Sequence, residues 1–224
     1  MRMKIKSIEK LQDLLAQDIA WRKKELIEIR LLIHASQNPA FCRMGIAMLS
    51  AHFEGFVRQA ANYYIIHVAS QNIKISKLYT NFVAIHSKKL FEPCMSSDKI
   101  TVYQKSIEDF LDNYTRCTFR VKYSPEKPVI KTESNPSSSV VKNIFDSIGL
   151  DFSPYETKKN YIDTDLLKNR HSIVHGERTY VDVSDFDNTF TIILEIMEQL
   201  FEQIIKIAID RGYLRCKQTC PKAP

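Results

Sequence analysis

Hydrophobic residues recur along the chain mostly at three- and four-residue steps, a spacing that predicts α-helices. The first regular stretch covers residues 7 to 35, and Ser7 is placed to cap its start. Its apolar positions are Ile8, Leu11, Leu14, Leu15, Trp21, Leu26, Ile29 and Leu32. The spacing predicts one long amphipathic helix here.

A second long helix is predicted to begin directly after the first. Asn38 followed by Pro39 is a helix-start pattern, because asparagine caps the first turn and proline is tolerated in it. The helix that it opens carries apolar residues at Phe41, Met44, Met48, Phe53, Phe56, Val57, Ala60, Tyr64 and Ile65. This helix should be the most buried one of the fold.

The pattern becomes less regular in the middle of the chain. Residues 73 to 90 support a third helix. Between about residues 91 and 160 the pattern degrades into short apolar clusters, with a short helix over 105–113 and a strand-like segment over 118–123. We interpret this region as an insertion or an irregular connection.

Three further helix patterns follow towards the C-terminus. Serines precede a helix over 140–148, which Gly149 can end in the left-handed conformation. A helix over 162–175 is ended in the same way by Gly176. The sequence of residues 184–187 (Ser-Asp-Phe-Asp) resembles a capping box and opens a long closing helix.

These patterns predict an all-α fold. It is a helical bundle with two long N-terminal helices, an irregular middle, a short helix and a long C-terminal helix. The 5 glycines and 8 prolines are too few for a sandwich or barrel, which would need turn residues about every 8–12 positions. We expect a single domain over residues 1–210, with residues 91–160 as the insertion, and a basic tail over 211–224.

Composition favours an anionic partner and a cytoplasmic location. The 32 Lys and Arg residues exceed the 26 Asp and Glu residues, a net charge of +6 that suits nucleic acid. The basic runs at the two termini are most simply solvated tails. The 5 cysteines are odd in number and scattered, and no apolar run reaches the roughly 20 residues that span a bilayer. We therefore expect no membrane contact.

Motifs for phosphate-binding glycine loops and for serine hydrolases are absent. His171 and His175 are four residues apart, but Ser172 stands where a zinc protease needs glutamate, and no third ligand is apparent. Cys216 and Cys220 lack a matching second pair. We expect neither a metal nor a cofactor.

The densest group of chemically useful side chains lies at the end of the helix over 162–175. It contains Arg170, His171 and His175 within two turns. Arginine can hold a phosphate through two N–H groups, and histidine can exchange a proton near neutral pH. These groups would support metal-free phosphodiester transfer within RNA, with the ribose 2′-hydroxyl as the attacking group.

The geometry of one helix limits how these residues can cooperate. At about 100° per residue, Arg170 and His175 lie roughly 140° apart, whereas His171 and His175 lie on one face. One helix therefore does not direct Arg170 and His175 at the same atom. They could converge if their side chains wrap towards a groove, or if two copies meet across a two-fold axis.

A structural role is the alternative, and composition and spacing alone favour it. The histidines would then be cations favoured by the helix dipole, and Arg170 would pair with an acid such as Glu54. Glu54 could pair with Arg58 instead. We favour a Glu54 that orients Arg170, because Gly55 would let another helix approach closely. Trp21 is interpreted as a core anchor rather than as a platform for stacking a base.

Three segments resemble the HEPN superfamily. The string from Arg170 to His175, followed by Gly176, is similar to its R-x4-6-H motif, usually R-N-x-x-x-H. Residues 21–26 and 51–57 look like the W-R-x-x-E-[LI] and A-[HY]-[WF]-E-G-F segments of the RiboL-PSP-HEPN and cyanobacterial-type branch. Residues 131–149 also resemble that branch.

The resemblance implies a helical bundle whose dimers place two motifs in one cleft. It also implies a metal-independent endoribonuclease of toxin–antitoxin, restriction or anti-phage systems. Arg170 would bind the phosphate, His175 would be the acid or base, and His171, Glu54 and Asn169 could support them. His171 stands where many members have asparagine, which leaves its role open.

The resemblance further implies an RNA substrate, a homodimer and a possible antitoxin or defence-system partner. Glu177 stands where some members carry a tyrosine that accepts a nucleotide, so this route of silencing is not expected. The alternative function is a non-catalytic HEPN module that binds RNA, nucleotide or a partner protein.

Overall fold

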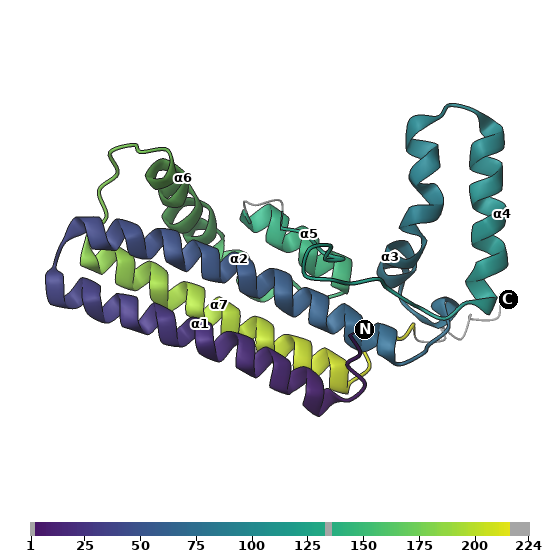
Figure 1. The fold of residues 1–224 in the computed structure, drawn as a ribbon, viewed down its shortest axis with the longest axis horizontal. Coiled ribbons are helices and arrows are strands. Elements are labelled where there is room, and N and C mark those ends of the chain that lie inside the picture. The colour runs from purple at the N-terminus through teal and green to yellow at the C-terminus, as the bar shows by residue number, and fades with distance from the viewer. Residues whose placement is uncertain (1–2, 133–135, 216–224) are drawn as a thin grey trace, which may run out of the picture.

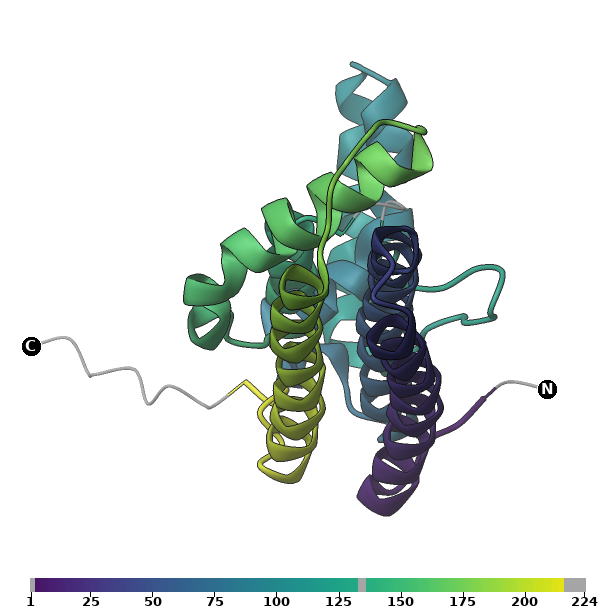
Figure 2. The ribbon, with the colours of Figure 1, turned by 90° about the vertical axis from the view of Figure 1, so that its left-hand side faces the viewer.

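The computed structural model describes residues 3–132 and 136–215, which form an all-α fold. Three long helices lie side by side along the molecule: α1 (Ile8–Ser36), α2 (Pro39–Ser70) and α7 (Val183–Ile209) (Figures 1 and 2). Both α2 and α7 run antiparallel to α1 (Figure 1). The core fills the space between them, and the predicted bundle is confirmed.

The starts of the first two helices are as predicted. Ser7 Oγ accepts a hydrogen bond from the Lys10 N–H at 3.2 Å, and the Asn38 side chain accepts one from the Ala40 N–H at 2.9 Å. Pro39 occupies the first turn of α2. Among the described helices, α2 contributes the most buried residues, which confirms that it is the central helix.

The capping box expected over residues 184–187 forms two residues earlier. Asp182 is the N-cap of α7, and its carboxylate accepts a hydrogen bond from the Asp185 N–H at 2.8 Å. Asp187 instead accepts a hydrogen bond from Arg30 Nε of α1 at 2.8 Å. The predicted capping box was therefore two residues out of register, because the Asp187 side chain pairs with Arg30 and joins α7 to α1.

The middle of the chain is more helical than its pattern predicts. It contains η1 (Ile75–Lys77), α3 (Thr80–Phe91), η2 (Glu92–Ser96) and α4 (Ile100–Arg116). Helices α3 and α4 form a hairpin that projects from the bundle (Figure 1). The strand predicted over 118–123 was wrong, since this segment lies extended with only an isolated bridge from Thr118 to Lys74.

The remaining elements lead to the segment of chemical interest. Helix α5 (Ser138–Ile148) is capped by Ser137, and Gly149 follows it in the left-handed conformation at φ 77°, as predicted. The 3₁₀ turn η3 (Ser153–Lys158) then leads to η4 (Tyr161–Lys168) and α6 (Asn169–Val174). None of the helices in the described part of the chain combines the length and apolar character that crossing a membrane requires.

Candidate functional site

The predicted helix over 162–175 consists of two parts with different windings. Its first part, η4, is a π-helix, and the right-handed backbone continues through Asn169 into α6. Ile162 and Leu166 are buried and anchor η4 on the bundle. π-helices are rare and frequently lie at functional sites, and this one ends one residue before Asn169 and Arg170 begin α6.

The end of α6 is held in a defined turn. The Glu177 N–H donates to the Ser172 carbonyl at 2.8 Å, and the Gly176 N–H donates to the Ile173 carbonyl at 3.2 Å. This pair of bonds is a Schellman motif, and Gly176 supplies the left-handed residue that it needs, at φ 74°. The motif fixes the backbone at His175, the last residue of the turn.

The connection after α6 is also fastened to α2. The Arg43 Nη2 group donates a hydrogen bond to the Glu177 carbonyl at 3.1 Å. The short helix therefore lies against the N-terminal half of α2 (Figure 1) and is restrained at its C-terminal end.

The motif residues occupy two faces of this helix. The rings of His171 and His175 are 4.3 Å apart between centroids, and both residues are exposed. Arg170 is half-buried and lies one turn from Leu166 and near Ile173, which pack against the core. The structure thus brings the two histidines together and leaves Arg170 on another face, as helix geometry predicts.

Glu54, the acid expected to pair with Arg170, does not contact it. Glu54 Oε1 accepts a hydrogen bond from the Thr132 hydroxyl at 2.7 Å. Within the described residues, Arg170 forms no hydrogen bond or ion pair, and Glu54 pairs with neither Arg170 nor Arg58. The prediction that Glu54 orients Arg170 was wrong for the single chain, because Thr132 occupies that carboxylate.

Asn169 uses its side chain within its own helix. Its Nδ2 group donates to the Asp165 carbonyl at 2.9 Å, one turn earlier. Burial, together with the charge of Asp185, raises the pKa of Asp165. Asn169 therefore stabilises the junction between η4 and α6.

A cluster around Arg22 joins the two other segments that resemble the HEPN superfamily. The guanidinium of Arg22 donates two hydrogen bonds to Asp18, at 3.0 and 3.2 Å, and one to the His52 carbonyl at 3.3 Å. A Cβ atom at Gly55 would lie 2.5 Å from Arg22 Nη1. Gly55 therefore makes room for the Arg22 side chain of α1, rather than for the motif helix as expected.

The aromatic residue beside this cluster is not a core anchor. Trp21 is 49% exposed, so that prediction was wrong. Its ring lies 4.6 Å from the Arg22 guanidinium and meets the His52 ring edge-on. Burial lowers the pKa of His52, and Glu25, 2.9 Å from its Nε2, opposes that shift. The sequence pattern did not predict that Arg22, Trp21 and His52 form a cluster. Its residues nevertheless belong to the two segments, 21–26 and 51–57, that resemble the HEPN superfamily.

Among the described residues, no group of three or more His, Cys, Asp or Glu side chains could hold a metal ion. His171 and His175 stand together without a third ligand in that part of the chain. Cys216 and Cys220 lie outside the described residues.

The comparison with known families supports the resemblance. The model of the RiboL-PSP-HEPN family matches residues 17–206, most of the chain. The chain belongs to this family. No curated protein and no solved structure matches it. HEPN domains are often ribonucleases and often dimerise, so membership of the RiboL-PSP-HEPN family suggests a ribonuclease or a nucleotide-related module.

Proposed function

We propose that this RiboL-PSP-HEPN protein is a metal-independent endoribonuclease whose active sites lie in the cleft of a homodimer. The observation that carries the proposal is that the fold leaves the motif side chains unused. Arg170 forms no hydrogen bond or ion pair among the described residues, and His175 is exposed at a fixed turn. Solvent reaches the guanidinium nitrogens of Arg170, since none of them is among the buried side-chain atoms without a partner, and the group is therefore open to a phosphate.

The reaction is the attack of a ribose 2′-hydroxyl on the adjacent phosphorus. His175 takes the proton of that hydroxyl, and the oxygen forms a bond to phosphorus while the bond to the 5′-oxygen breaks. The leaving 5′-oxygen takes a proton from solvent. Arg170 holds the non-bridging oxygens and stabilises their growing negative charge through paired N–H groups. The products are a 2′,3′-cyclic phosphate and a 5′-hydroxyl.

The second copy is needed because one chain places Arg170 and His175 on different faces of α6. In the dimer, Arg170 of one copy and His175 of the partner subunit serve the same phosphate. The ring of His171 contacts that of His175 and restricts its orientation, so His171 supports the base. We assign Asn169 to positioning the helix, through its bond to the Asp165 carbonyl. Glu54 binds Thr132 and is given no part in the reaction.

The biological setting that we propose follows the family. The protein acts in the cytoplasm as a toxin or anti-phage defence nuclease on an RNA substrate. An antitoxin or another defence-system protein would be its regulatory partner.

A second candidate function is a non-catalytic module that binds RNA, nucleotide or a partner protein. The separation of Arg170 and His175 in one chain favours it, as does His171 in the place of asparagine. A strictly monomeric protein that binds RNA in a salt-dependent way without turnover would support this candidate.

The test is cleavage of total RNA and tRNA by the purified protein in excess EDTA. Arg170→Ala and His175→Ala should each lower the rate at least about a hundredfold, the usual loss for a phosphate-binding or acid–base group. Arg116→Ala, which removes an exposed arginine from α4, is the matched control and should cut like the parent. Intact RNA from a folded parent dimer would instead support the binding module.

A further inference from the structure

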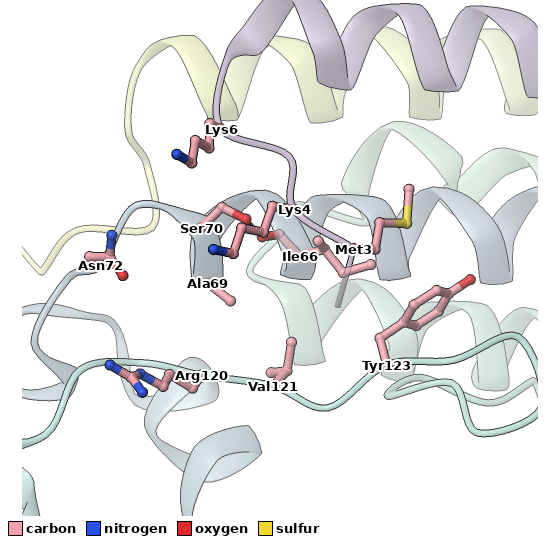
Figure 3. A pocket seen from close by; sticks show the side chains of 10 residues that line it. All are labelled: Met3, Lys4, Lys6, Ile66, Ala69, Ser70, Asn72, Arg120, Val121 and Tyr123. Carbon is pink, nitrogen blue, oxygen red and sulfur yellow. Dashed lines mark hydrogen bonds between the residues drawn. The ribbon is translucent and has the colours of Figure 1, made fainter. Parts of the chain in front are cut away.

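A polar cavity of about 270 Å³ lies at the C-terminal end of α2 (Figure 3). Three segments that are distant in sequence form its walls. They are the residues before α1, the last turn of α2 with Asn72 beyond it, and the extended connection over 120–123. The cavity lies about 40 Å along α2 from Arg43, which touches the loop after the motif helix, at 1.5 Å per residue.

One end of the cavity is strongly basic. Figure 3 shows Lys4 and Lys6 on one wall and Arg120 on the opposite wall, with Asn72 beside them. No acidic residue lines the cavity, and none of the three cations forms an ion pair among the described residues. The Arg120 backbone N–H donates to His86 Nδ1 at 3.3 Å, and its side chain donates only through Nε, to the Thr118 hydroxyl at 3.2 Å, so the terminal nitrogens remain available.

The backbone that carries these cations is fixed by the fold. Ile5, which stands between the two lysines, is fully buried and donates its N–H to Ser70 Oγ at 3.0 Å. Phe119, which precedes Arg120, is fully buried and donates its N–H to the Ile73 carbonyl at 2.8 Å. Packing thus fixes the backbone from which three exposed cationic side chains extend around one space, and an anion between them would relieve their mutual repulsion.

The other end of the cavity is apolar and aromatic. Met3 and Tyr123 lie there, opposite the basic end (Figure 3). Tyr123 is half-buried, and its hydroxyl accepts a hydrogen bond from Gln59 Nε2 at 3.2 Å, which holds the ring in place. A ring fixed in this way offers a surface on which a planar base can stack.

We propose that this cavity is a binding site for a nucleoside phosphate. The phosphate lies between Lys4, Lys6 and Arg120, and the base lies towards Met3 and Tyr123. The ligand is either a free nucleotide or one nucleotide of an RNA chain, since both present the same chemistry. The site does not depend on the proposed catalysis, because none of its residues belongs to the motif.

The test is calorimetric titration at low salt of the full chain carrying Arg170→Ala and His175→Ala, so that RNA is not cut. The probes are ADP, pyrophosphate and a tetranucleotide of RNA. We expect binding in which removal of Lys4 and Arg120 together raises the Kd about tenfold or more, the effect of losing a charge-assisted contact. Arg120→Lys should retain most of the affinity.

The matched control removes two exposed lysines of the α3–α4 hairpin, Lys99 and Lys105, and should leave every Kd unchanged. Tyr123→Leu should weaken the binding of ADP but leave the Kd for pyrophosphate unchanged, because only ADP has a base that can stack on the ring. Binding of ADP would identify a free nucleotide as ligand, and binding of the tetranucleotide alone would identify RNA.

The proposal is overturned if no probe binds the folded protein, or if the Lys4 and Arg120 variant, shown to be folded by its melting curve, binds as the parent does. Either of these two results would leave the proposed ribonuclease activity untouched, because RNA cleavage is measured separately on protein that keeps Arg170 and His175.

Discussion

Arg22 shows what the hydrophobic pattern of α1 does not reveal. The pattern places a stripe of apolar residues on one face, but Trp21 and Leu32 at its flank are 49% and 65% exposed. The buried position beside Trp21 is instead taken by Arg22, which is only 8% exposed. Sequence spacing identifies the face of a helix, whereas the contact of Arg22 with Gly55 depends on how α1 and α2 cross.

Gly55→Ala should lower the free energy of unfolding by about 1–3 kcal/mol, the cost of leaving buried polar groups unsatisfied. The added methyl group would displace the Arg22 guanidinium, which lies 2.5 Å from the new Cβ, and break its bond to the His52 carbonyl. Urea denaturation measures this loss.

A double-mutant cycle isolates the contact between these two residues. With Arg22→Met already in place, Gly55→Ala should cost much less than it does alone, because the group that it displaces is gone. Equal costs in both backgrounds would show that Gly55 serves another purpose.

At the scale of elements, local capping rules predicted the starts of α1 and α2 and the ends of α5 and α6. Ser7, Asn38, Gly149 and Gly176 act as expected, because a cap depends on neighbouring residues only. The start of α7 was placed two residues late because Asp182 and Ser184 both fit the capping pattern, and the contact between Arg30 and Asp187 decides between them. The spacing of apolar residues in η4 did not distinguish its π-helical winding from an α-helix.

The turn after α6 provides a prediction about the motif helix. Gly176→Ala should destabilise this turn by about 1–2 kcal/mol, because a residue with a Cβ atom resists the left-handed conformation. Apart from its two chain neighbours, no atom of the described residues lies within 4 Å of the new Cβ, so the backbone alone causes the effect. Hydrogen exchange at the backbone amides of positions 176 and 177 should be faster in this variant than in the parent.

Gly176→Asn is the matched control, because asparagine tolerates this conformation. It should retain most of the amide protection and most of the RNA cleavage. Protection in the alanine variant equal to that of the parent would contradict the role assigned to Gly176.

At the scale of the whole molecule, the sequence predicted the bundle and the motif but not the long-range arrangements. Arg170 and His175 stand close together in the sequence, so their density is visible there. The hydrogen bond from the Thr132 hydroxyl to Glu54, by contrast, joins positions 78 residues apart. The cavity that Lys4 and Arg120 line likewise depends on the packing of distant segments, which no local pattern encodes.

Stability should fall as the pH is lowered from 7.5 to 5.5. Burial lowers the pKa of His52, His67 and His86, so the unfolded chain binds more protons than the folded one just below the ordinary histidine pKa. The free energy of unfolding in urea, measured at one protein concentration, should therefore be smaller at pH 5.5. His67→Gln should reduce this difference, and an equal or higher stability at pH 5.5 would refute the assignment.

The most direct test of the composite active site mixes two inactive variants. Arg170→Ala and His175→Ala proteins, carrying different tags, are combined in equal amounts and allowed to exchange subunits. If Arg170 of one copy works with His175 of the other, half of the dimers are mixed and each has one intact site, so about one quarter of the parent activity should return. Mixed dimers that form but leave RNA as intact as either variant alone would contradict an active site shared between two copies.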